Sequence, residues 1–139
     1  MRIYTSYFAK EKELKSKGVI CVSICAFPPK WFNGVNLIQV APKNDILLDY
    51  KKDQDKDKYI RRYYFEVLKN LDVESFIKEL ERISQGKDIA LCCYEKIGDF
   101  CHRHLLAKYL NIKGNYNITE YNSIIKDDNI IETLKQDIN

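Results

Sequence analysis

The sequence has no long hydrophobic run. No stretch approaches the roughly 20 consecutive apolar residues that cross a bilayer. The opening residues, MRIYT, lack the apolar core of a signal peptide. Internal repeats and low-complexity tracts are absent as well. We therefore expect a soluble, cytoplasmic protein that has no membrane partner.

The chain also has little excess charge and no CxxC motif. A net charge of +3 permits a basic patch but does not by itself indicate a nucleic-acid-binding protein. The five cysteines are odd in number, and the adjacent Cys92 and Cys93 would point to opposite faces of a strand. This pattern does not resemble a disulfide framework, so a reducing compartment fits better.

The length of 139 residues predicts a single domain over residues 1–139. The polar run KKDQDKDK, at 51–58, is expected to be a solvated loop or helix end rather than a linker. Residues 124–139 are polar and only weakly amphipathic, and we expect them to form a mobile C-terminal tail.

Strands and helices are predicted to alternate along most of the chain. Hydrophobic patterning predicts strands over 2–8, 19–26, 37–40, 88–94 and 116–121, and helices over 9–17, 44–50, 59–71, 73–85 and 101–110. The continuous apolar runs VICVSICA and IALCCY are typical of strands buried on both faces. This order predicts an α/β fold, a three-layer Rossmann-like domain whose mainly parallel sheet is flanked by helices.

The run CCYEKIGDFCHRH, at 92–104, concentrates reactive side chains. It contains Cys92, Cys93, Cys101 and both histidines, and it lies between a predicted buried strand and a predicted helix. Ligands commonly bind at such strand-to-helix turns in α/β proteins. The sequence therefore locates a candidate site without naming a reaction.

This run resembles the signature of the bacterial family called domain of unknown function 488 (DUF488), in which C-x-E-K is followed by C-H-R and a small apolar helix. Weaker matches extend the resemblance over roughly residues 2–121. The resemblance implies a single α/β domain with a site at this turn, but no substrate. Many members carry an aspartate–arginine pair at the end of the second strand, where this chain has Val22-Ser23-Ile24-Cys25.

The candidate catalytic residues are Glu95, Cys101 and His102. A cysteine at a helix N-terminus is favoured as the thiolate by unpaired amides and the helix dipole. Glu95 at a strand end could act as a general base or hold Arg103 in an ion pair. Arg103 is a candidate fork for a phosphate or carboxylate.

Aromatic and basic residues elsewhere could approach the same end of the sheet. They are the candidate ligand-binding residues Tyr94, Tyr4, Lys51, Tyr59 and Tyr63, although tyrosines at such positions also commonly fill a core. We therefore predict binding of a phosphate-bearing ligand, a nucleotide or nucleic-acid component, with hydrolase or transferase activity. The sequence indicates no particular cofactor and no oligomeric state.

Two alternatives stay open. The tyrosine-rich middle, with Arg61 and Arg62, also suits a non-catalytic module that binds nucleic acid or protein. Cys93, Cys101, His102 and His104 include the ligand types of a structural zinc site, but at unusual spacing, so the preferred interpretation assigns no metal ligand.

A tyrosine-phosphatase loop is excluded. That loop separates its cysteine and arginine by five residues, whereas Cys93 is too far from Arg103 and Cys101 too close.

Overall fold

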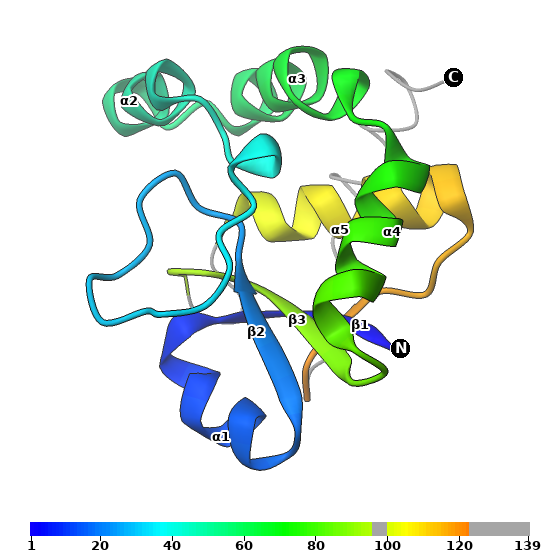
Figure 1. Cartoon of the computed structure of the whole chain (residues 1–139). Helices are drawn as coiled ribbons and strands as arrows, with labels where there is room; N and C mark the ends of the chain where they lie inside the picture. Colours follow the sequence, from blue (N-terminus) through cyan, green and yellow to red (C-terminus); the bar gives the residue numbers. More distant parts are fainter. Residues whose placement is uncertain (96–99, 123–139) are drawn as a thin grey trace.

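The computed structural model describes residues 1–95 and 100–122, and the predicted tail at 124–139 lies outside them. Its sheet is entirely parallel, with the strand order β2-β3-β1-β4 (Figure 1). The strands are β1 (Ile3–Tyr7), β2 (Val19–Ser23), β3 (Asp88–Cys93) and β4 (Thr119–Glu120). The predicted α/β class and parallel sheet are confirmed.

Helices cover the sheet because its apolar strands must be buried on both faces. They are α1 (Glu11–Ser16), α2 (Asn44–Asp53), α3 (Lys56–Glu66), α4 (Val73–Ser84) and α5 (His102–Gly114). Helix α1 packs on β2, whereas α4 and α5 contact β3 and each other. Right-handed crossovers with this strand order place α1 on one face and α4 with α5 on the other, which makes three layers.

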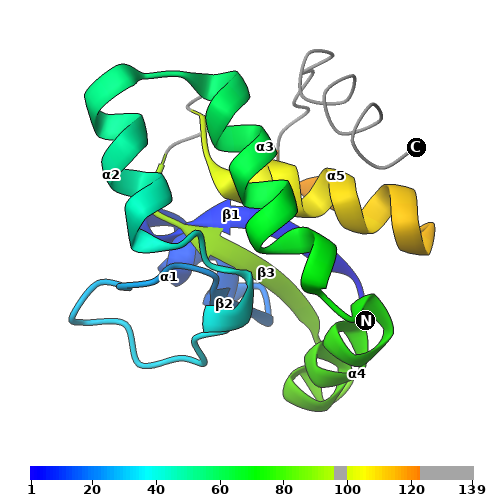
Figure 2. The same cartoon turned by 90° about the horizontal axis from the view of Figure 1, so that it is seen from above.

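Helices α2 and α3 lie side by side, and α3 crosses above the start of α5 (Figures 1 and 2). Arg62 of α3 joins them, because its guanidinium contacts Asp45 at 2.8 Å and Asp49 at 2.7 Å, both on α2. On its other side α3 packs against α5, with the ring of Tyr63 5.7 Å from that of His102. Helix α3 therefore covers the start of α5.

Helix α3 begins inside the polar run that sequence reasoning assigned to a loop or helix end. The side chain of Asp55 accepts a hydrogen bond from the Lys58 amide at 3.1 Å, the pattern of a helix N-cap. The helix also ends earlier than predicted, at Glu66, and a separate 3-10 turn covers Leu68–Asn70.

The predicted strand at 37–40 is wrong. Within the described residues, a single bridge between Ser23 and Asn36 extends the edge of β2. After Leu37 the amides bond locally, Val40 to Leu37 and Ala41 to Ile38, so Ile38–Val40 is a 3-10 turn. These local hydrogen bonds are favoured over further strand pairing because Pro42, which follows closely, has no N–H to donate to a sheet.

Nothing in the described part of the chain has the length and apolarity of a membrane-spanning helix. This finding agrees with the hydropathy of the sequence.

Candidate functional site

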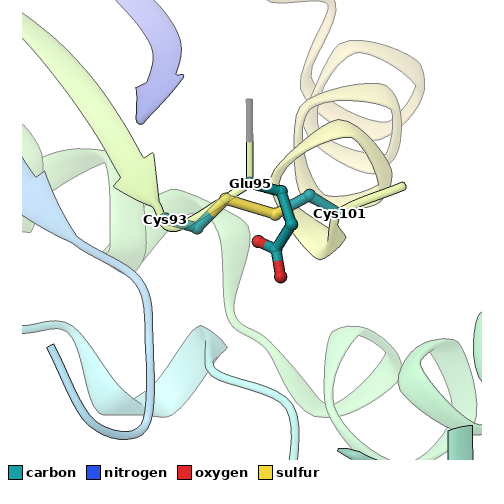
Figure 3. Close-up of side chains that lie close together, drawn as sticks. All are labelled: Cys93, Glu95 and Cys101. Atoms are coloured by element: carbon teal, nitrogen blue, oxygen red, sulfur yellow. A yellow bond between two sulfur atoms is a disulfide. The ribbon is translucent and has the colours of Figure 1, made fainter. Parts of the chain in front are cut away.

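The CCYEKIGDFCHRH run lies where β3 gives way to α5, at the carboxyl edge of the parallel sheet. Cys93 is the last residue of β3, and Cys101 occupies the N-cap of α5 in extended conformation. A disulfide joins these two cysteines, whose Cα atoms lie 7.5 Å apart (Figure 3). The sequence predicted the strand-turn-helix but no disulfide. Cys92 is free and buried, as expected of a core cysteine.

Arg103 is completely buried and forms an ion pair with Glu120 of β4. Its Nε donates to one carboxylate oxygen and its Nη2 to the other, each at 3.0 Å. Thr5 also donates to Glu120, at 2.5 Å. The Arg103–Glu120 pair thus ties α5 to the edge strand across the end of β1.

The remaining contacts of Arg103 hold the turn itself. Its Nη1 donates to the Glu95 carbonyl at 2.6 Å and lies 2.8 Å from Cys93 Sγ. The ion pair of Arg103 within the described residues is thus with Glu120, and its contact with Glu95 is to the backbone carbonyl. Arg103 is not among the residues that line the adjacent cavity. Its contacts hold the turn next to the cavity in place.

A cavity of about 460 Å³ opens beside the turn. Its lining unites six of the nine candidates from the sequence, which are Glu95, Cys101, His102, Tyr94, Lys51 and Tyr59. It also contains residues that sequence reasoning did not select, among them Cys25, Asn44, Tyr50, Gln54 and Phe100. Helix α2, the segment after β2 and the turn before α5 all contribute residues to the lining of the cavity.

Aromatic rings form one wall of the cavity. Tyr50, Tyr59 and Phe100 pack mutually, with ring centroids 5.0–5.3 Å apart. The Lys56 ammonium lies 5.7 Å from the centre of the Phe100 ring, and Lys51 is exposed at the rim. An aromatic wall therefore stands beside basic side chains.

His102 is buried and neutral. Its Nε2 donates to the Ile24 carbonyl at 2.6 Å, which leaves Nδ1, 3.8 Å from Cys101 Sγ, as the acceptor nitrogen. Burial lowers the pKa of His102 to about 4, with a smaller contribution from the charge of Arg103 and against the opposing effect of the hydrogen bond to Ile24. The pKa of Cys25, also in the cavity wall, is raised to about 12, chiefly by burial.

Two candidate ligand-binding tyrosines lie away from the cavity lining. Tyr4 is on β1 and packs edge-to-face against Tyr121, with centroids 5.4 Å apart. Tyr63 is fully buried, and its hydroxyl donates to the Val40 carbonyl at 2.5 Å. Tyr63 therefore fixes the 3-10 turn that leads into α2.

We expect Tyr63→Phe to lower the free energy of unfolding by about 1–2 kcal/mol, because the buried Val40 carbonyl loses its donor. Chemical denaturation would measure the change. Tyr64→Phe is the matched control, since Tyr64 is also buried in α3 but its hydroxyl makes no hydrogen bond within the described residues. Equal losses in the two variants would contradict this role of Tyr63.

A family model described as DUF488-N3a, the active DUF488-N3 subclade, matches residues 9–114. The chain belongs to the DUF488 family. Comparisons with curated proteins and with solved structures give no match. The resemblance found in the CYEK and CHRH motifs is thereby confirmed.

The range matched by the DUF488 model contains the whole lining of the cavity. It excludes Glu120, the partner of Arg103. The sequence contains only a weak signal for this acid, an isolated carboxylate between Thr119 and Tyr121 in a short predicted strand.

Proposed function

We propose that this DUF488 protein binds a phosphate-bearing ligand, a nucleotide or a nucleic-acid component, in the cavity beside the turn. The observation that carries the proposal is the joint placement of the aromatic wall and Lys51 around one cavity of ligand size. The aromatic wall suits a flat base, and the Lys51 ammonium suits a phosphate.

The aromatic wall supports recognition of a base. Base–aromatic stacking contributes roughly 1–3 kcal/mol per base and tolerates different bases, because every base has a π face. Tyr50 and Phe100 are only partly buried, so part of each ring remains open to a ligand. Lys56 beside Phe100 adds positive charge at this wall.

Two features support binding of the phosphate. Lys51 lines the cavity, and no salt bridge involves it within the described residues. The first turn of α5 contains no acidic residue, and the Cys101 side chain makes no capping hydrogen bond. The partial positive charge at this helix start therefore favours an anion.

Glu95 is the proposed acid–base group. It is exposed and lines the cavity, whereas Cys101 is bonded to Cys93 and His102 is held by Ile24. In a hydrolysis, Glu95 would take a proton from water as the water oxygen bonds to phosphorus. The phosphorus–oxygen bond to the leaving alcohol then breaks, and that alcohol receives the proton. An alcohol in place of water makes the reaction a transfer. The description of the matched subclade as active supports catalysis without naming a reaction.

Calorimetric titration with AMP, GMP, CMP, UMP, inorganic phosphate and a short single-stranded DNA tests the proposal. We expect at least one nucleotide to bind the wild-type protein, and Lys51→Ala to weaken that binding by roughly tenfold through loss of one charge-assisted contact.

Lys52→Ala is the matched control, because Lys52 is the neighbouring exposed lysine but does not line the cavity. Its affinity should equal that of the wild type. If none of these probes binds, or if the two lysine variants lose affinity equally, the proposed ligand site is wrong. Binding of DNA alone, with unchanged affinity in Glu95→Gln, would favour a non-catalytic module.

A further inference from the structure

We propose that the reduced protein holds a soft divalent cation, zinc by the chemistry of its donors, between Cys93, Glu95 and Cys101. This inference goes beyond the nucleotide site and does not depend on it. The two sulfurs and one Glu95 carboxylate oxygen all lie within 4.8 Å of one another. Figure 3 shows the Glu95 side chain beside the two sulfurs, at the junction of β3 and α5.

The backbone spacing suits an ion between the sulfurs. The Cα atoms of Cys93 and Cys101 lie 7.5 Å apart, beyond the 4.4–6.8 Å that is usual for disulfides. Zinc lies about 2.3 Å from each thiolate sulfur, so a tetrahedral site separates two sulfurs by a little under 4 Å. Reduction of the disulfide would therefore leave two thiolates at a spacing that a metal can bridge.

The surroundings favour thiolates over thiols. Arg103 Nη1 lies 2.8 Å from Cys93 Sγ and can donate to the thiolate. Two hydrogen bonds to Glu120 already balance the charge of Arg103, which limits its repulsion of a cation. Cys101 lies at the N-terminus of a helix of 13 residues, where the dipole stabilises negative charge.

The donor set differs from the structural zinc site considered from the sequence. His102 turns its Nε2 to Ile24, so Glu95 rather than a histidine supplies the third donor. Glu95 and Cys101 both line the cavity, so the fourth position of the ion faces open space. Three protein donors with an open position are typical of catalytic zinc sites.

The disulfide and the metal complex exclude each other, since both use the same two sulfurs. Oxidation by a peroxide would convert the two thiolates to the disulfide and release the cation. Two electrons then pass to hydrogen peroxide, which takes up two protons and leaves as two water molecules. Metal content is therefore expected to follow the redox state.

Equilibrium dialysis of the reduced protein against zinc, with metal analysis, tests the site. We expect about one equivalent per wild-type chain, and Cys93→Ser and Cys101→Ser to bind at least about 100-fold more weakly. Glu95→Gln should bind about tenfold more weakly or worse. Cobalt substitution should give thiolate-to-cobalt charge-transfer absorption, and peroxide-treated protein should bind no zinc.

Cys21→Ser is the matched control, because Cys21 is a free, partly exposed cysteine outside the cluster. It should retain the wild-type affinity. The cobalt absorption of the wild-type protein gives a second readout that needs no variant, and oxidation by peroxide should abolish it. Failure of the reduced wild type to bind zinc would overturn the proposal, as would equal losses in Cys21→Ser and Cys93→Ser or unchanged binding in Glu95→Gln.

Discussion

Arg103→Met is expected to lower the free energy of unfolding by about 3–5 kcal/mol, because it leaves the Glu120 carboxylate buried without its cation. For a domain of this size that loss corresponds to a fall in Tm of about 10–15 °C. The variant also removes the donors to Cys93 and to the Glu95 carbonyl, so the turn before α5 loses its support. Thermal and urea denaturation of the two proteins would measure the effect.

The double variant Arg103→Met/Glu120→Leu separates the ion pair from general loss of packing. It should recover part of the lost stability, since an apolar pair of similar size carries no unpaired charge. Arg82→Met is the matched surface control, because Arg82 pairs with Glu79 on the exposed face of α4 and should be nearly neutral. A stable Arg103→Met that has merely lost nucleotide binding would show instead that Arg103 contacts the ligand.

Phe100→Ala is expected to weaken nucleotide binding by about 10- to 100-fold, because it removes a ring from the aromatic wall of the cavity. Calorimetric titration with the best-bound mononucleotide would give the ratio of dissociation constants. Affinity for inorganic phosphate should change little, since Lys51 and the start of α5 remain.

Phe65→Ala controls for the loss of an aromatic side chain. Phe65 is 48% exposed on α3 and packs against Tyr64, outside the cavity lining. Its removal should leave nucleotide affinity unchanged. Equal weakening by Phe65→Ala and Phe100→Ala would contradict stacking in the cavity.

Much of the fold could be predicted because its signals are local. Continuous apolar runs predicted the buried strands β2 and β3, and helical spacing with Gly86 predicted α4 almost to its ends. Local sequence signals could not decide whether residues 37–40 form a strand. Their apolar residues fit a strand, but only contact with a neighbouring strand could hold it, and within the described residues the sheet edge pairs no further than Asn36.

The site was predicted where residues are close in sequence. Glu95, Cys101 and His102 share one motif, and the structure brings all three to the cavity. The partner of Arg103 could not be found, because Glu120 meets it only through pairing of β4 with β1. Helical spacing also could not separate Tyr59 from Tyr63, which lie one turn apart on α3. Tyr59 lines the cavity, whereas the Tyr63 hydroxyl is bonded to Val40 in the core.

Chemical-shift mapping of the aromatic side chains during titration with AMP would locate a bound nucleotide directly. We expect saturable shifts of Tyr50, Tyr59 and Phe100, while the signals of the edge-to-face pair Tyr4 and Tyr121 stay unchanged. Inorganic phosphate should shift the signals of these rings less than AMP does. Shifts confined to Tyr4 and Tyr121, or no saturable shift at all, would contradict a nucleotide site in this cavity.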